Sequence, residues 1–137
     1  MIAIVCLDDK NGMSFNHRRQ SRDACLGREI LTLTRGRRLW MAPYSEGQFG
    51  PEDAGRFSVS ETFLEEAAPG DYVFVEDRAL APFAEKLEQL IIFRWNRAYP
   101  GDRYFDLDLA EGPWHKAESR DFPGKSHEKI TMEVYTR

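Results

Sequence analysis

Residues 1–23, MIAIVCLDDKNGMSFNHRRQSRD, decide the fold. They begin with an apolar run over residues 2–7, and two acids and the turn pair Asn11-Gly12 follow. A continuous apolar run that ends at turn residues is typical of a strand buried on both faces. Such a strand lies in the middle of a sheet, and open α/β sheets bind ligands in the loops that leave the carboxyl ends of their strands. We therefore expect a central first strand and a ligand site beside the loop over residues 8–21.

The rest of the chain alternates between helix and strand patterns. Residues 43–55, rich in Gly, Pro and acids, are predicted to form a connection with one helical turn. Strand–helix–strand repeats followed by two long strands predict an α/β fold with three layers. It is a single domain over residues 1–137, with a central mixed, mainly parallel sheet, helices on both faces and a C-terminal antiparallel hairpin. The predicted helices cover residues 22–34, 61–67 and 77–87, and the later strands 37–42, 56–59, 71–75, 90–93, 114–121 and 129–137.

Composition excludes several classes of protein. A length of 137 residues suits one domain with a real core, and no apolar run approaches the length of a bilayer span. No signal peptide pattern is present, and Cys6 and Cys25 are too few for a disulfide framework, so we expect reduced thiols in a cytoplasmic protein. His17, His115 and His127 show no metal-ligand spacing, so no metal site is expected.

The net charge of −4 hides an asymmetry along the chain. Residues 1–42 hold eight Lys/Arg and four Asp/Glu, whereas residues 43–137 hold eleven and nineteen. A basic patch can attract an anionic partner, and Phe15 offers a stacking face for a nucleic-acid base. The acidic remainder argues against nucleic acid, and a solvated surface is the simpler interpretation. The basic excess lies in two clusters, Arg18, Arg19 and Arg22, and Arg35, Arg37 and Arg38.

Several segments, in this order, carry a resemblance to a known family. They are residues 4–9 and 12–18, 33–41, 87–93 with the turn Gly101-Asp102-Arg103-Tyr104-Phe105, and Trp114 with the ending Val134-Tyr135-Thr136-Arg137. Together they cover most of the chain and resemble dihydrofolate reductase. The resemblance implies a shortened, divergent member of that family with its three-layer fold.

The substrate side departs from that family's pattern. Leu26 stands where the family has its helix carboxylate, and Phe93 stands where it has a threonine that contacts the pterin. The Pro-Trp pair after the active-site loop is replaced by Gln20-Ser21. The comparison therefore implies that folate reductase activity has been lost.

The cofactor side departs further. Ala42-Pro43-Tyr44-Ser45 stands in place of the phosphate-binding Gly-Arg-x-Thr, and Glu76-Asp77-Arg78 stands in place of Gly-Gly. A glycine pair lets backbone amides approach a diphosphate, whereas two acids repel it, at a cost on the order of 1–4 kcal/mol for like charges ~4 Å apart. The segment 43–70 also lacks the arginine-bearing turn that reads the adenosine phosphate. We therefore expect no cofactor, and no binding of NADPH.

Our leading hypothesis is a domain that binds a small molecule or a protein partner at the old substrate position. Arg18, Arg19 and Arg22 would lie at the mouth of the pocket and bind the anionic tail of an apolar or aromatic ligand. One alternative is a divergent NAD(P)H-dependent oxidoreductase with a cleft between Ala42 and Glu76. Another is an RNA- or nucleotide-binding, or RNA-processing, protein that uses the arginine clusters. The residues predicted to line the pocket are Cys6, Met13, Phe15, Leu26, Ile30 and Phe93.

No catalytic residue is assigned from the sequence. His17 could act with Asp8 or Asp9 as an acid/base pair, but a solvated loop histidine is the simpler interpretation. Cys25 could be a nucleophile near a helix N-terminus, but a small buried residue is the simpler interpretation.

Overall fold

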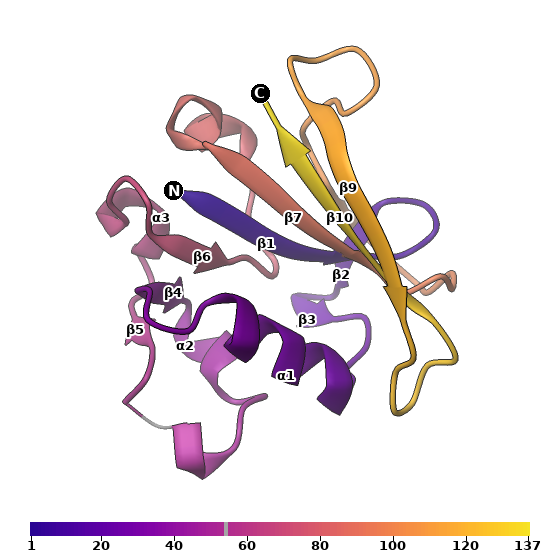
Figure 1. Cartoon of the computed structure of the whole chain (residues 1–137), viewed down its shortest axis with the longest axis horizontal. Coiled ribbons are helices and arrows are strands. Elements are labelled where there is room, and N and C mark those ends of the chain that lie inside the picture. The colour runs from indigo at the N-terminus through magenta and orange to yellow at the C-terminus, as the bar shows by residue number, and fades with distance from the viewer. Residues whose placement is uncertain (54) are drawn as a thin grey trace.

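A seven-stranded mixed sheet forms the centre of the molecule (Figure 1). The computed structural model describes residues 1–53 and 55–137. The order of strands across the sheet is β5-β4-β6-β1-β7-β10-β9. The first five strands in this order run parallel to one another, and β10 and β9 form an antiparallel hairpin at one edge. This confirms the predicted sheet. Its strands are β1 (Ile2–Leu7), β4 (Leu39–Met41), β5 (Ser58–Val59), β6 (Tyr72–Phe74), β7 (Gln89–Arg94), β9 (His115–Phe122) and β10 (Ile130–Thr136).

Strand β1 lies between β6 and β7 and sends side chains into two cores, one on each face of the sheet. Val5 and Leu7 belong to one buried cluster, and Ile4 belongs to the other. Successive side chains of a strand point to opposite faces, so a run that is apolar at every position fills both cores. The expected central strand is therefore present.

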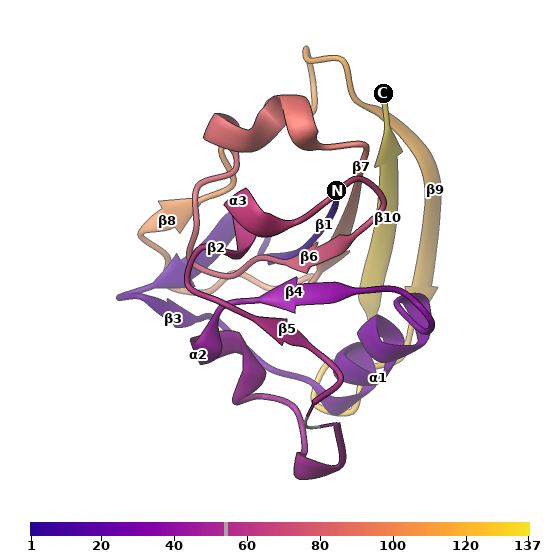
Figure 2. The ribbon, with the colours of Figure 1, turned by 90° about the vertical axis from the view of Figure 1, so that its left-hand side faces the viewer.

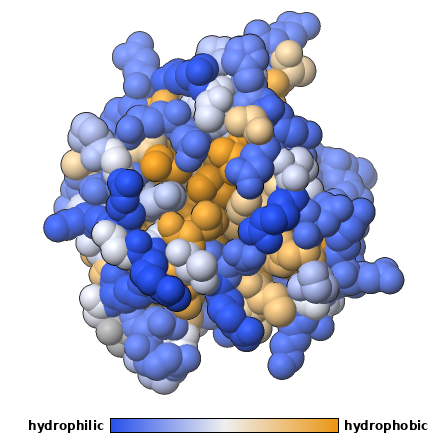
Figure 3. Space-filling view, in the orientation of Figure 1, coloured by the Kyte–Doolittle hydropathy of each residue, from blue (hydrophilic) through white to orange (hydrophobic). Residues whose placement is uncertain are grey.

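Helical segments cover both faces of the sheet, as predicted, and Figure 2 shows them on its two sides. Helix α1 (Ala24–Leu33) places Leu26 and Ile30 in the core that contains Ile4. Helix α3 (Phe63–Glu66) and the 3₁₀ segment η2 (Ala81–Lys86) pack on the opposite core. In Figure 3 the apolar side chains on the α1 side gather in the middle of the face, with hydrophilic residues around them.

The loop predicted over residues 8–21 contains two strands, which is a correction. Strands β2 (Gly12–Phe15) and β3 (Arg18–Arg19) pair with β8 (Arg103–Tyr104) in a second, three-stranded sheet of order β3-β2-β8. The two residues between β2 and β3, Asn16 and His17, have φ of 51° and 62°. Positive φ at both central residues is typical of the tight turns that join antiparallel strands. The turn therefore forms without the glycine that usually signals it.

The predicted helix over residues 77–87 is also wrong, because only η2 forms there. Asp77 has a φ of 40°, which no right-handed helix contains, and Pro82 lies at the beginning of η2. The connection over residues 43–55 has two short helical turns instead of one, α2 (Pro43–Glu46) and η1 (Pro51–Asp53), and its Ala54 lies outside the described residues. Within the described part of the chain, no helix has the length and hydropathy needed to cross a membrane.

Candidate functional site

The β2–β3 hairpin lies against the carboxyl end of β6 and is held there by Glu76. The guanidinium of Arg19 pairs with both oxygens of this carboxylate, with Nε to Oε2 at 3.0 Å and Nη2 to Oε1 at 3.2 Å. Ser45 Oγ donates to Oε1 at 2.8 Å, and the guanidinium also lies 4.3 Å from the centre of the Tyr44 ring. A bidentate arginine–carboxylate pair is both strong and geometrically specific. Glu76 therefore fixes the hairpin against the sheet.

Asp77 forms the second anchor of the same hairpin. Its carboxylate accepts hydrogen bonds from Ser14 Oγ at 2.7 Å and Arg103 Nε at 3.1 Å, and it lies 2.9 Å from His17 Nδ1. Burial works against ionisation of Asp77, but the hydrogen bonds from Ser14, His17 and Arg103 outweigh it and hold the pKa of this carboxyl below its ordinary value. We refer to Glu76, Asp77 and these partners as the strand-end cluster.

The strand-end cluster lies at the position where the resemblance places Gly-Gly, so its residues determine whether a dinucleotide fits there. Two carboxylates stand there, and the positive charges beside them, on Arg19 and Arg103, are already paired with them. A diphosphate needs free backbone amides or unpaired cations at this position. This set of residues does not fit that group.

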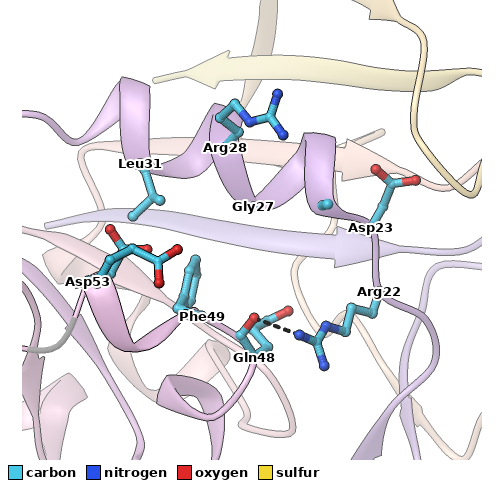
Figure 4. Close-up of a pocket in the computed structure, with 11 residues that line it drawn as sticks. Arg22, Asp23, Gly27, Arg28, Leu31, Gln48, Phe49 and Asp53 are labelled. Atoms are coloured by element: carbon cyan, nitrogen blue, oxygen red, sulfur yellow. Dashed lines mark hydrogen bonds between the residues drawn. The ribbon is translucent and has the colours of Figure 1, made fainter.

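A candidate site on the α1 side is a cleft between α1 and the segment over residues 48–53, which we call the α1 cleft (Figure 4). It has a volume of about 300 Å³. Leu31 and Phe49 supply apolar surface, Arg22 lies at one end and Asp53 at the other. The remaining lining residues are Asp23, Ala24, Gly27, Arg28, Gln48, Gly50 and Glu52.

Gln48, in the lining of the α1 cleft, has a buried side-chain atom without a hydrogen-bond partner among the described residues. Its backbone oxygen accepts a hydrogen bond from Arg22 Nη2 at 3.1 Å, which holds the cleft end together. Its side-chain Nε2 is buried and has no hydrogen-bond partner among the described residues. An unpaired buried donor costs about 1–3 kcal/mol, so native structures rarely retain one without a reason. Gln48 therefore keeps one buried donor beside the cleft that no described residue accepts from.

A second hollow, of about 360 Å³, lies beside the β2–β3 hairpin. Phe15 is 48% exposed there, and the buried Oε1 of Gln20 has no partner among the described residues. Asn16, Arg18, Arg19 and Pro100 complete its lining.

The structure separates the six residues predicted to line one pocket. Met13 belongs to the core on one face of the sheet, together with Val5. Leu26, Ile30 and Phe93 are buried in the other core, where the half-buried Cys6 packs against them. Burial raises the pKa of the Cys6 thiol, as does the nearby Glu76 carboxylate. Phe15 lines the hairpin hollow. That any of these residues contacts a ligand stays a prediction from the sequence.

The three arginines predicted at the pocket mouth lie at two different hollows. Arg18 and Arg19 line the hairpin hollow, and Arg22 lines the α1 cleft. Arg19 is paired with Glu76, so its charge is less available to a ligand than the other two.

A buried polar cluster at the beginning of α1 was not predictable from the sequence. Asp23 caps this helix by accepting a hydrogen bond from Cys25 N at 2.8 Å. It also lies 3.0 Å from His127 Nδ1, and both side chains are almost fully buried. The two residues are far apart in the chain, so no local spacing could have paired them. Among the described residues, no group of three or more His, Cys, Asp or Glu is arranged to hold a metal ion.

The dihydrofolate reductase from Enterococcus faecalis, in a complex with NADP(H) and RAB-propyl, has a similar structure. The TM-score is 0.69, and the match covers 99% of this chain and 95% of that chain at 11% sequence identity. The protein therefore has a dihydrofolate reductase-like fold in divergent form, as the sequence motifs indicated. No family model matches the chain, and no curated protein matches it by sequence. At this level of identity the likeness establishes the fold and leaves the function to be argued from the site.

Proposed function

We propose that this protein is a binding domain for a small anionic organic molecule, that its ligand occupies the α1 cleft, and that it has lost folate reductase activity. Gln48 lines the cleft, and its buried Nε2 has no partner among the described residues; this observation carries the proposal. Ligand sites are typically clefts of 300–1,000 Å³ with apolar surface and a few convergent polar groups. This cleft has a volume of about 300 Å³, and Leu31 and Phe49 supply its apolar surface.

The charges of the cleft set the orientation of the ligand. Arg22 and the Gln48 amide lie at the same end, where a carboxylate or phosphate would accept hydrogen bonds from both. Leu31 and Phe49 suit an apolar or aromatic middle part. Asp53, at the other end, favours a hydrogen-bond donor on the ligand. The ligand class is therefore an aromatic or apolar molecule with an anionic tail.

Loss of reductase chemistry is supported on both sides of the former site. Leu26 is buried in the core of the sheet, at the position where the resemblance places a carboxylate. The strand-end cluster occupies the position where it places the glycine pair. We infer that NADPH is not a cofactor of this chain, although the Enterococcus faecalis enzyme is complexed with NADP(H).

Thermal unfolding with a panel of ligands tests the proposal. The panel contains benzoate, indole-3-acetate, 4-aminobenzoylglutamate, NADPH and a short single-stranded RNA. A ligand at a hundredfold excess over Kd adds about 2.7 kcal/mol to the free energy of unfolding, which raises Tm by several degrees. We expect a rise with at least one aromatic carboxylate. A rise with NADPH alone would revive the oxidoreductase alternative, and a rise with RNA alone would transfer the site to the arginine clusters.

A substitution of Gln48 sharpens the test, because it changes stability and affinity in opposite directions. Gln48→Met keeps the length of the side chain and removes the unpaired donor, so the ligand-free protein gains about 1 kcal/mol. The same variant binds the aromatic carboxylate about tenfold more weakly in a calorimetric titration. Arg35→Ala, which removes an exposed arginine outside the cleft, is the control. Equal affinity of Gln48→Met and the parent protein contradicts the proposal.

We also propose a cellular compartment and a class of binding partner for this protein. Cys6 and Cys25 are both free thiols in the structure, which supports a reducing compartment and hence the cytoplasm. A protein partner replaces a small molecule in our proposal only if no ligand of the panel raises Tm.

A further inference from the structure

Four side chains from three separate segments meet at the beginning of α1. His127 Nδ1 lies 3.0 Å from Asp23 Oδ2. On its other side, His127 Nε2 lies 3.0 Å from Ser21 Oγ and 2.9 Å from Tyr99 OH. We refer to Ser21, Asp23, Tyr99 and His127 as the hydroxyl–imidazole cluster. It lies outside the strand-end cluster, and only Asp23 borders the α1 cleft.

Asp23 is held as a carboxylate by an unusual number of donors. Beyond the helix cap, it accepts hydrogen bonds from the backbone N–H groups of Lys125, Ser126 and His127, at 3.0, 2.8 and 3.1 Å. Burial works against ionisation, but the bond from Lys125 N–H, followed by those from His127, Ser126 and Cys25, holds the pKa of this carboxyl well below its ordinary value. A fixed negative charge therefore faces one nitrogen of the imidazole.

The orientation of His127 follows from its neighbours. A carboxylate at Nδ1 favours the tautomer that carries its proton on that nitrogen, which leaves the lone pair of Nε2 free to accept. The ring stacks on Trp95 with a centre-to-centre distance of 4.5 Å and an angle of 28°, so it cannot swing away. The lone pair of Nε2 is thereby directed at the two hydroxyl groups.

We propose that Ser21 is a nucleophile that accepts an acyl group, with His127 as its general base and Asp23 as the residue that positions the imidazole. A hydroxyl, an imidazole and a carboxylate in hydrogen-bond reach of one another, in this order, are the arrangement that activates serine on several unrelated folds. The inference goes beyond the binding function proposed above and does not depend on the identity of the ligand in the α1 cleft.

Ser21 is half-buried and is flanked by the two hollows of this face. Its neighbour Gln20 lines the hairpin hollow, and its other neighbour Arg22 lines the α1 cleft. Arg18, in the hairpin hollow, adds a further positive charge. These guanidinium groups favour an ester or thioester that carries a negative charge.

The chemistry balances with water as the only co-reactant. Ser21 Oγ bonds to the carbonyl carbon while its proton passes to His127 Nε2, and the Asp23 carboxylate stabilises the imidazolium. The carbon–oxygen or carbon–sulfur bond of the leaving group then breaks, and the leaving group takes the proton from His127. Water next attacks the acyl group, giving a proton to His127, and the acid leaves as Ser21 Oγ recovers that proton.

Tyr99 provides an internal check, because its hydroxyl shares the Nε2 lone pair with Ser21. A hydrogen bond from Tyr99 competes with the one from Ser21. Tyr99→Phe is therefore expected to increase the rate of the reaction at Ser21.

A fluorophosphonate probe tests the nucleophile on the intact protein. Ser21 Oγ forms a bond to phosphorus as fluoride leaves, and peptide mass spectrometry locates the adduct. We expect labelling at Ser21 in the parent protein and in the control Ser60→Ala, which removes an exposed serine hydroxyl elsewhere. Labelling is lost in Ser21→Ala and falls about a hundredfold or more in His127→Gln. Thermal unfolding of each variant establishes that it is folded.

Ester hydrolysis gives the second measurement. The rate of phenol release is compared for 4-acetoxybenzoate, which is anionic, and for its neutral methyl ester, with the uncatalysed rates subtracted. We expect turnover that requires Ser21 and prefers the anionic ester. Labelling at Tyr99 or at no residue, or hydrolysis that Ser21→Ala leaves unchanged, overturns the proposal. Labelling and hydrolysis are measured without the ligand panel, so failure of the panel to raise Tm contradicts only the proposed binding function, whereas loss of labelling and hydrolysis contradicts only this inference.

Discussion

The protein holds buried or half-buried carboxylates in two contrasting ways. At the beginning of α1, Asp23 receives most of its hydrogen bonds from backbone N–H groups and is completely buried. At the end of β6, Glu76 and Asp77 are held by side chains, mainly those of Arg19 and Arg103. Backbone donors cannot leave without unfolding two segments, whereas a long side chain can swing into water. The first carboxylate is therefore part of the fold, and the others fasten a hairpin to it.

This contrast predicts that removing Asp23 has the largest effect on stability. Asp23→Ala leaves the N–H groups of the segment around His127 and the cap of α1 without an acceptor, and we expect a loss of about 3–5 kcal/mol. Urea denaturation followed by circular dichroism measures it. Asp121→Ala, at an exposed pair with Lys129, is the matched control and costs less than about 1 kcal/mol. Equal losses of stability in the two variants would contradict a structural role for the buried Asp23 carboxylate.

Breaking the Glu76 anchor should have a smaller effect, confined to the hairpin. Glu76→Ala removes a charge-assisted, bidentate pair with Arg19, and we expect a loss of about 1.5–3 kcal/mol. Hydrogen exchange should become faster in β2 and β3 and stay unchanged in β1. Glu61→Ala, which breaks an exposed pair with Arg78, is the control and should change stability by less than about 0.5 kcal/mol. Faster exchange throughout β1 would show that the anchor supports the whole sheet.

The pH dependence of the free energy of unfolding should show the same difference between Asp23 and Asp77. Both Asp23 and Asp77 have a folded-state pKa below the ordinary value of about 3.9, so each contributes stability that is present above that pH and is lost as pH falls through the lower, folded-state pKa. Unfolding free energies measured between pH 6 and pH 2 should therefore fall on acidification. Asp23→Asn should flatten this dependence more than Asp77→Asn, because the Asp23 side chain is fully buried and that of Asp77 is 15% exposed. A greater flattening by Asp77→Asn would contradict the ranking.

The smallest effect is expected from His17, the most exposed member of the strand-end cluster. Its side chain is 83% exposed, and its contact with Asp77 is screened by water and salt. His17→Ala should change the free energy of unfolding by less than about 0.5 kcal/mol in urea denaturation. A larger loss would indicate that its positive-φ turn, and not the ion pair, holds the hairpin.

Much of the sheet could be predicted because its strands are apolar in patterns that only a sheet explains. The run from Ile2 to Leu7 predicts a strand with a core on each face, and the alternation over residues 129–137 predicts a strand with one wetter face. The β2–β3 hairpin could not be predicted, because its strands are short and Asn16 and His17 supply positive φ without a glycine. The sequence pattern after Asp77 predicts a helix, but Asp77 has a positive φ and only the 3₁₀ segment η2 forms.

The candidate sites were less predictable than the fold. Arg22 was expected beside a ligand, and it lines the α1 cleft. The Gln48 amide has no distinguishing sequence signal, because only its burial without a partner marks it. The hydroxyl–imidazole cluster joins Ser21 and Asp23 to His127 across more than a hundred residues.

The sequence by itself determined the class of fold, the central position of β1 and the absence of the glycine pair after β6. These properties depend on which residue types follow one another, and hydrophobic burial acts on that order directly. The tertiary structure alone decided that Glu76 and Asp77 hold the hairpin and that His127 lies between Ser21 and Asp23. It also decided that Gln48 Nε2 is buried without a partner among the described residues. These properties depend on distances between atoms far apart in the chain, and such distances exist only once the two cores have packed against the sheet.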